Sequence, residues 1–359
     1  MTKKFDPNPG CTDGRVRAIV DAVRPAIDGG RFAVKRVVGD VMVVEADCFA
    51  DGHDILRVML RWRAQGDAIF SEVEMVALGN DVWRAAFSLP AIGRYVYTVV
   101  AWVDHFASWR HELARRVDMD DIRIAAQVGA MLVDEMAERA VADDRQTLTA
   151  WAVKLRRSAH DAKADAEILK ALALDETLVA LAAKYPARKF ETAYPVELPL
   201  VADGHRARAS SWYEMFPRSS AAEPGRHGTF ADVEARLPYV AELGFDVLYF
   251  PPIHPIGRVK RKGKNNTLEA DAADVGSPWA IGAAEGGHTS ILPELGTAAD
   301  FRRLVAKASG LGIEIALDIA FQCAPDHPWV TAHPGWFQTR PDGSVQYAEN
   351  PPKKYQDIY

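Results

Sequence analysis

Polar and apolar residues alternate along the chain between residues 31 and 103. The runs RVMLRW and YVYTV show this period of two, which is typical of strands that bury one face. The predicted strands span residues 32–38, 41–49, 55–62, 71–78, 82–89 and 94–103, and pairs such as Gly-Asp and Gly-Asn separate them. Strands at this spacing predict an immunoglobulin-like β-sandwich. A sandwich alone leaves its role open between packing or dimerisation and direct binding of a glycan.

The pattern becomes helical between residues 108 and 184, where apolar residues recur three or four positions apart. One predicted face carries Ile124, Val128, Met131, Leu132 and Met136, and another carries Leu148, Trp151, Ala152 and Leu155. We predict a small antiparallel helical bundle, with its Met and Trp residues in the core. The proline-containing segment 190–205 is predicted to be an edge strand or a linker.

After residue 210 the chain alternates between amphipathic helices and short apolar strands. A helical pattern at residues 230–243 is followed by the strand 245–250, and a second helix at 301–308 precedes the strand 313–319. This order predicts parallel βα units, either of a βα-barrel or of a doubly wound sheet. Both folds place their chemistry at the carboxyl ends of the strands. The predicted domains are residues 1–107, 108–190 and 191–359.

Composition narrows the functional classes. The 359 residues are 48% hydrophobic and 26% charged, which is enough for more than one core. A net charge of −6 gives no reason to expect nucleic acid as a partner. Three scattered cysteines, Cys11, Cys48 and Cys323, argue against a disulfide framework. Without a membrane-length apolar run or a signal-peptide pattern, we expect a soluble cytoplasmic protein.

Two polar stretches follow predicted barrel strands. The first holds Arg258, Lys260, Arg261 and Lys262, and such a cluster suits an anion, commonly phosphate, although a solvated charged loop is the alternative. The second begins with Asp318, which could line a site or serve a structural role. Gln322 and Cys323 follow it, and Cys323 is expected to be a small buried thiol rather than a nucleophile.

The segment from residue 332 to residue 359 combines aromatic rings with amide, basic and acidic groups. Flat rings beside hydrogen-bonding side chains are typical of carbohydrate sites. No nucleotide-binding loop, zinc-protease motif or Ser-His-Asp signature is present.

These stretches resemble the α-amylase superfamily of (β/α)-barrel enzymes, and within it the α-1,4-glucan:maltose-1-phosphate maltosyltransferases. The resemblance is carried by SSWYEMFPRS, GFDVLYFPPIHPIGR, RKGKNN, GHTSILPELGT, LDIAFQCAPDHPWV and HPGWFQTRPDGSVQYAENPPKKYQDIY. The sequence is closely similar from about residue 209 to the end. For the sandwich and the helical insertion, the resemblance lies in the order and size of these parts. It implies the first part of a (β/α)8 TIM barrel, truncated after the third strand.

The resemblance also implies roles for particular residues. Maltose 1-phosphate would contact Lys262, Gln322 and Asp357, with Asn350, Lys353 and Tyr355 close by in the donor site. Asp318 would be the supporting acid of the barrel core. Ordinary amylases carry Asn-His at the positions of Gln322 and Cys323, which counts against a plain starch hydrolase.

The implied function is that of a hexosyltransferase of α-glucan (glycogen) biosynthesis. It would transfer maltosyl units from maltose 1-phosphate to the non-reducing end of α-1,4-glucans, with retention and release of phosphate. The resemblance implies that this chemistry requires no metal or organic cofactor. The family's nucleophilic Asp and acid/base Glu would lie beyond Tyr359, so the chain is expected to be an inactive fragment. The alternatives are an α-glucan hydrolase or branching enzyme, and a non-catalytic glycan-binding or dimerisation module. The expected partners are the two substrates and a second copy in a homodimer, with neither nucleic acid nor membrane.

Overall fold

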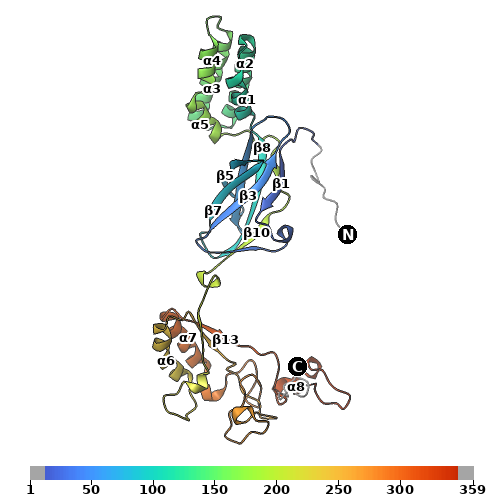
Figure 1. The fold of residues 1–359 in the computed structure, drawn as a ribbon, viewed down its shortest axis with the longest axis vertical. Helices are drawn as coiled ribbons and strands as arrows, with labels where there is room; N and C mark the ends of the chain where they lie inside the picture. Colours follow the sequence, from blue (N-terminus) through green and yellow to red (C-terminus); the bar gives the residue numbers. More distant parts are fainter. Residues whose placement is uncertain (1–12, 347–359) are drawn as a thin grey trace. The chain divides into compact units, whose positions relative to one another are not determined.

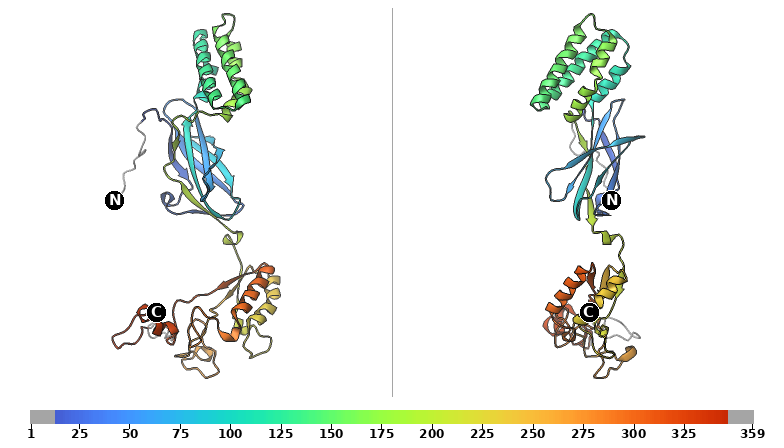
Figure 2. Two further views of the ribbon diagram at one scale, coloured as in Figure 1. Left: turned by 180° about the vertical axis from the view of Figure 1, so that it is seen from behind. Right: turned by 90° about the vertical axis from the view of Figure 1, so that its left-hand side faces the viewer.

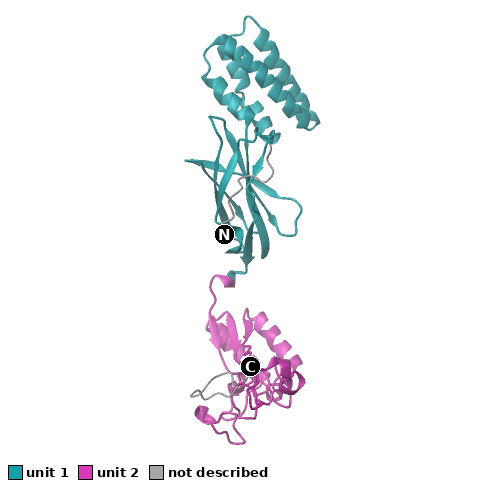
Figure 3. Ribbon diagram, turned by 90° about the vertical axis from the view of Figure 1, so that its right-hand side faces the viewer, with its two compact units in different colours: residues 1–205 teal, residues 206–359 magenta. Residues whose placement is uncertain are grey.

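The computed structural model describes residues 13–346 (Figure 1). The chain forms two compact units, residues 1–205 and residues 206–359 (Figure 3). Sheets and helices occur in both units, so the protein is multidomain. No helix among residues 13–346 is long and apolar enough to cross a membrane.

The first unit contains two sheets (Figure 2). Side chains of both sheets form one hydrophobic core. One sheet has the order β1 (Ile19–Arg24), β3 (Val41–Phe49), β7 (Val82–Ser88) and β6 (Val76–Gly79). The other has the order β2 (Val34–Val37), β10 (Leu198–Asp203), β8 (Gly93–Val103), β4 (Leu56–Ala64) and β5 (Ser71–Glu74), with β9 (Thr192–Ala193) beside β8. Met42, Val44, Leu60 and Tyr97 are completely buried between the sheets. The alternation in sequence is therefore the inward and outward alternation of these strands.

The structure differs from the predicted boundary at residue 191. Strand β10 pairs antiparallel with β8 and parallel with β2, so it belongs to the sandwich rather than to the last domain. Its residues Leu198, Leu200 and Ala202 point into the sandwich core. The helical segment is consequently an insertion between two strands of the same sheet. The predicted strand 71–78 is also divided, because β5 pairs with β4 in one sheet and β6 pairs with β7 in the other.

The insertion has five helices and its own core. They are α1 (His105–Arg115), α2 (Met119–Arg139), α3 (Ala142–His160), α4 (Ala166–Ala173) and α5 (Glu176–Lys184). Gly129 of α2 lets the ring of Trp109 approach, because a Cβ there would lie 2.0 Å from the indole. Met136 is buried as predicted, but Met131 is 64% exposed, together with Ile124 and Val128 on the outer side of α2. The predicted core position of Met131 is therefore wrong.

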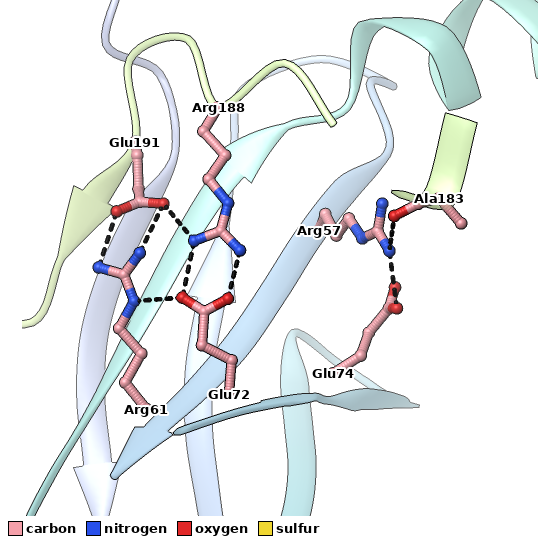
Figure 4. A network of polar contacts seen from close by, with 7 residues as sticks. All are labelled: Arg57, Arg61, Glu72, Glu74, Ala183, Arg188 and Glu191. Atoms are coloured by element: carbon pink, nitrogen blue, oxygen red, sulfur yellow. Dashed lines mark hydrogen bonds and ion pairs between the residues drawn. The ribbon is translucent and has the colours of Figure 1, made fainter. Parts of the chain in front are cut away.

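An ion-pair network joins the end of the insertion to the sandwich (Figure 4). Arg61 of β4 donates to Glu72 of β5 at 2.7 Å and pairs with Glu191 at 2.9 Å. Arg188, which follows α5, donates to the same Glu72 at 2.7 Å, and its guanidinium lies 4.8 Å from the ring centre of Trp102. The hydrogen bonds from Arg188 and Arg61 lower the pKa of Glu72 to about 2, with Arg188 the larger influence.

The second unit is built on a parallel sheet in the order β11 (Trp212–Glu214), β12 (Val247–Phe250) and β13 (Glu314–Leu317). Helix α6 (Phe230–Glu242) connects β11 to β12, and α7 (Ala298–Gly310) connects β12 to β13. Both helices begin with a capping box, Thr229 with Asp232 and Thr297 with Asp300. The predicted parallel βα order is confirmed for these strands. Long loops follow β12 and β13, and the latter loop contains the short helix α8 (Pro328–Ala332).

Candidate functional site

A cavity of about 330 Å³ lies at the carboxyl-end side of this parallel sheet, in the loops that follow β11 and β12. Its lining includes Phe216, Arg218, Lys262, Lys264, Asp274 and Trp279. Aromatic, cationic and acidic side chains therefore meet in one concave site.

The predicted cluster of four cations does not form one anion site. Arg261 donates to the backbone carbonyls of Ile256 at 2.7 Å and Gly257 at 2.8 Å, so it holds the loop together. Arg258 forms an ion pair with Glu285. Lys262 alone of the four lines the cavity, and it is only 8% exposed. A lysine is rarely buried to this degree unless its charge has a use or a partner.

Backbone geometry explains why asparagine and glycine recur in the cavity wall. Asn265 and Asn266 have φ values of 52° and 61°, in the left-handed region that asparagine tolerates better than most residues. Gly276, with φ of 75°, turns the opposite wall. A Cβ on Gly263 would lie 2.2 Å from the carbonyl oxygen of Glu269, so the loop can close only with glycine there.

Arg218 was not identified from the sequence. It lies in the FPRS segment after β11, where its Nη1 donates to the carbonyl of Gly276 at 2.8 Å and its guanidinium lies 5.3 Å from the ring centre of Phe216. Burial lowers the pKa of the Arg218 guanidinium. The position of Arg218 just beyond the carboxyl end of a predicted parallel strand could have marked it in the sequence as a candidate site residue.

The side chain of Trp279 lines the cavity and is hydrogen-bonded to Asp318. Its ring packs edge-on against Phe216, with 5.8 Å between the ring centres, and its indole Nε1 donates to Oδ2 of Asp318 at 2.6 Å. The pKa of Tyr249 is raised to about 12, first by burial and then by a hydrogen bond with the Asp318 carboxylate. Asp318, the first residue after β13, thus accepts from two aromatic side chains behind the cavity.

The segment that carries Gln322 and Cys323 is held by a chain of histidines. The backbone N–H of Trp329 donates to Nδ1 of His327 at 3.0 Å, so the proton of that neutral ring is on Nε2. Nε2 of His327 lies 3.1 Å from Nδ1 of His288, whose Nε2 lies 2.6 Å from the carbonyl of Ala320. Each ring therefore donates to the next group, and both are neutral. Burial first, and His288 second, lower the pKa of His327 to about 4.

His288, Cys323 and His327 also have potential metal-ligand atoms within 4.8 Å of one another, the one such group among residues 13–346. The directions of the hydrogen bonds disfavour a metal there. A metal on Nε2 of neutral His327 would require a proton on Nδ1, where the N–H of Trp329 already points. The cluster is better described as a hydrogen-bonded chain.

The other site residues predicted from the sequence do not all lie at this cavity. Gln322 is half-buried and does not line the cavity, and Cys323 is buried, as expected for a small apolar thiol. Asn350, Lys353, Tyr355 and Asp357 lie outside the described residues. In the predicted aromatic stretch, Phe337 is buried whereas Trp336 is 63% exposed and stacks on His333 at 4.1 Å.

Comparison with known proteins gives a consistent set of matches. The family model described as α-1,4-glucan:maltose-1-phosphate maltosyltransferase, domain N/S, matches residues 16–204. The maltosyltransferase of that name from Chlorobaculum tepidum is 51% identical over 96% of this chain and 51% of its own length. The one from Myxococcus xanthus is 49% identical over 94% of this chain and 51% of its own length. The chain thus spans about half the length of these curated relatives. Among solved structures, an α-amylase from Lactobacillus plantarum matches 43% of this chain and 32% of its own, with 36% identity and a TM-score of 0.33.

Proposed function

Because the chain belongs to the α-1,4-glucan:maltose-1-phosphate maltosyltransferase family, we propose that the protein takes part in transferring maltosyl units from maltose 1-phosphate to α-1,4-glucans. Transfer is to the non-reducing end of the glucan, with retention at the anomeric carbon and release of phosphate. The structural observation that supports this proposal is the cavity lined by Lys262. It combines a buried ammonium group with an aromatic wall.

The cavity suits both parts of the donor. The rings of Phe216 and Trp279 offer apolar faces for the C–H surface of a sugar. Lys262 and Arg218 offer positive charge to a phosphate, and their partial removal from water strengthens that attraction. We propose Gln322, Asn350, Lys353, Tyr355 and Asp357 as further donor contacts. Asp318 is proposed as the supporting acid of the same rim.

The reaction is a double displacement. A carboxylate attacks the anomeric carbon of maltose 1-phosphate, the bond from that carbon to the phosphate oxygen breaks, and phosphate leaves. A second carboxylic acid group gives its proton to the departing phosphate. The 4-hydroxyl oxygen of the glucan then attacks the anomeric carbon, the ester bond between that carbon and the first carboxylate breaks, and the hydroxyl proton passes to the second carboxylate. No residue of this chain is proposed for either carboxylate. This chain binds and orients the donor, so that the reacting atoms lie in the geometry that the reaction requires. The reaction uses neither a metal nor an organic cofactor.

The architecture that we propose follows from the same family. The first unit would be an immunoglobulin-like sandwich with a helical insertion, and the second would be the first part of a (β/α)8 barrel. The parallel order of β11, β12 and β13 supports the barrel assignment. A homodimer through the first unit is supported by the exposed apolar residues Ile124, Val128 and Met131 on α2. The cytoplasm is the proposed compartment.

The test is phosphate release from maltose 1-phosphate, with and without a maltooligosaccharide acceptor, by the protein as its gene encodes it. Acceptor-dependent release by the gene product supports maltosyl transfer. Hydrolysis of unphosphorylated glucan without release from the donor would favour a hydrolase or branching enzyme. Glycan binding without either reaction would favour a non-catalytic module.

A further inference from the structure

Phe321 and Gln322 lie on a short segment after β13, between two buried residues. Ala320 is 9% exposed and Cys323 is 3% exposed, whereas Phe321 is 86% exposed and Gln322 is half-buried. A loop has no ladder of strand hydrogen bonds to support it. The direction of its outward side chains therefore depends on what holds the buried residues beside them.

On one side of this segment, the anchor is a side chain from another loop. Nε2 of His288 lies 2.6 Å from the carbonyl oxygen of Ala320. Ala320 is almost completely buried, and a buried carbonyl costs free energy unless it accepts a hydrogen bond. On the other side, the backbone N–H of Ala324 donates to the carbonyl of Ile281 at 2.7 Å. The segment is thus held at both ends by the loop that follows β12.

A neutral imidazole suits the position of His288, because the group there must accept at one atom and donate from another. The N–H of Trp329 donates to Nδ1 of His327, so the proton on Nε2 of His327 points toward Nδ1 of His288 at 3.1 Å. His288 then carries its own proton on Nε2, toward Ala320. Its ring also stacks on Trp329, with 5.0 Å between the ring centres and 7° between the planes. Stacking and hydrogen bonds together fix the direction from which Ala320 is held.

The packing around these histidines leaves little room for another arrangement. His327 is 2% exposed, and a Cβ on Gly282 or Gly287 would lie 2.2 Å or 2.0 Å from its ring. The ring of His254 packs beside His288, with 5.8 Å between the ring centres. Closely packed groups of this kind transmit a displacement to their neighbours instead of absorbing it. Loss of the bond from His288 should therefore be felt along the segment that it holds.

We propose that His288 is a positioning residue, which holds the carbonyl of Ala320 and thereby directs Gln322 toward the phosphorylated donor. The proposal rests on the proposed function, in which Gln322 is a donor contact. It goes beyond that function because it assigns a role to a residue that acts from the loop after β12 on a side chain after β13, without contacting the donor itself. Preorganisation of a binding residue by a neighbouring hydrogen bond raises affinity, because less freedom is lost when the ligand binds.

The test is calorimetric titration of the protein as its gene encodes it with maltose 1-phosphate, in His288→Phe, in Gln322→Ala and in the double variant. His288→Phe keeps a ring that can stack on Trp329 and removes both hydrogen bonds. We expect each single substitution to weaken binding about tenfold, and the double variant to bind within about twofold of Gln322→Ala. His288→Gln should recover part of the loss, because its amide can still donate to Ala320.

A matched control is His227→Phe. His227 is half-buried in the same unit, its Nδ1 lies 2.8 Å from the carbonyl of its neighbour Gly228, and it does not line the cavity. It should bind like the wild type. Circular dichroism and thermal melting establish that each variant is folded. If His288→Phe fails to fold, His288→Asn replaces it in the comparison, since the shorter amide cannot span both partners of the imidazole.

A second measurement tests the anchor without any substitution. Nitrogen-15 spectra of the histidine-labelled wild type should show Nδ1 unprotonated and Nε2 protonated in both His288 and His327. The single variants at these positions assign the signals. A protonated Nδ1 on His288 would overturn the anchor at Ala320, whatever the ligand does.

The outcomes separate this proposal from the proposed function. Additive losses in the double variant would overturn the positioning role, because His288 would then act on binding independently of Gln322. Wild-type affinity in a folded His288→Phe would also overturn it and would keep the donor site. Absence of maltose 1-phosphate binding by the wild type would contradict the donor site and the effect of His288 on affinity. The anchor at Ala320 would then stand or fall by the nitrogen spectra alone.

Discussion

The indole N–H of Trp279 and the carboxylate of Asp318 are joined by a hydrogen bond of 2.6 Å. Trp279 belongs to the loop after β12, and Asp318 is the first residue after β13. The carboxyl ends of two parallel strands are thereby connected through an aromatic side chain of the cavity wall. The position of Trp279, and with it one side of the cavity, depends on Asp318.

Replacing Trp279 by Phe should therefore destabilise the second unit by about 2 kcal/mol, because a partly buried carboxylate loses a hydrogen-bond donor. Urea unfolding followed by far-ultraviolet circular dichroism measures the change. Trp212→Phe is the matched control, since the Trp212 indole donates only to the exposed Ser210. Its effect should stay within about 0.5 kcal/mol. Equal effects of the two substitutions would show that the bond to Asp318 adds nothing.

Stability should fall as the pH is lowered from about 6.5 to about 4 because of His327. Its ordinary pKa of 6.5 applies to the unfolded chain and is lowered to about 4 in the fold by burial and by the neighbouring His288 and His254, against the opposing effect of Asp326. The unfolded state binds more protons in this window, so unfolding becomes easier as the pH falls, by at most about 3 kcal/mol.

The measurement for His327 is the free energy of unfolding across this pH range. His327→Asn should flatten the dependence, although it also lowers stability at neutral pH. The exposed His333 provides a control, and His333→Asn should keep the slope of the wild type. An unchanged slope in His327→Asn would contradict the assignment.

Gly287 should tolerate no side chain. A Cβ at this position would lie 2.0 Å from Nε2 of His327, and His327 is also enclosed by Gly282. Gly287→Ala should cost about 1–3 kcal/mol by forcing the imidazole away from His288. Gly335→Ala is the control, because nothing lies within 4 Å of that Cβ. Thermal melting of both variants, and the histidine nitrogen chemical shifts of Gly287→Ala, test the displacement. A melting temperature equal to that of Gly335→Ala would refute the steric argument.

Glu72→Gln should loosen the attachment of the helical insertion to the sandwich. Glu72 accepts from Arg61 and Arg188, and these bonds lower its pKa from 4.5 to about 2 (Figure 4). A lowered carboxyl pKa stabilises the fold above pH 4.5, and this contribution is lost as the pH falls toward 2. Because the group is partly solvated, we expect a loss of about 1 kcal/mol at neutral pH.

Hydrogen exchange of the amides of β5 and α5 reports the loosening at Glu72. The exposed Glu138 on α2 offers a control, and Glu138→Gln should leave the exchange unchanged. Equal exchange in wild type and Glu72→Gln would show that Arg61 and Arg188 hold the insertion without this carboxylate.

Features carried by local sequence could be predicted, and features that depend on distant pairing could not. The helix that begins at Phe230 and the strand at Val247 follow from the local pattern of apolar residues. Strand β10 was assigned to the wrong domain because its partner β8 is separated from it in sequence by the whole helical insertion. A lone alternating segment does not indicate which sheet it joins.

The site shows the same division. The run of cations indicated a possible anion site, and the family resemblance singled out Lys262. The sequence could not show that Arg261 donates to backbone carbonyls and that Arg258 pairs with Glu285. Arg218 becomes visible only when the segment after β11 is placed beside Gly276. The bonds among His288, His327 and Ala320 likewise join separate loops, and no spacing rule encodes them.

The most direct measurement of donor binding is the affinity of the chain for maltose 1-phosphate in the wild type and in Lys262→Ala. Lys260→Ala is the control, because Lys260 is exposed and does not line the cavity. We predict that the wild type binds maltose 1-phosphate more tightly than maltose, that Lys262→Ala weakens this binding at least about tenfold, and that Lys260→Ala changes it less than about threefold. Equal affinity of wild type and Lys262→Ala for maltose 1-phosphate would contradict the donor site.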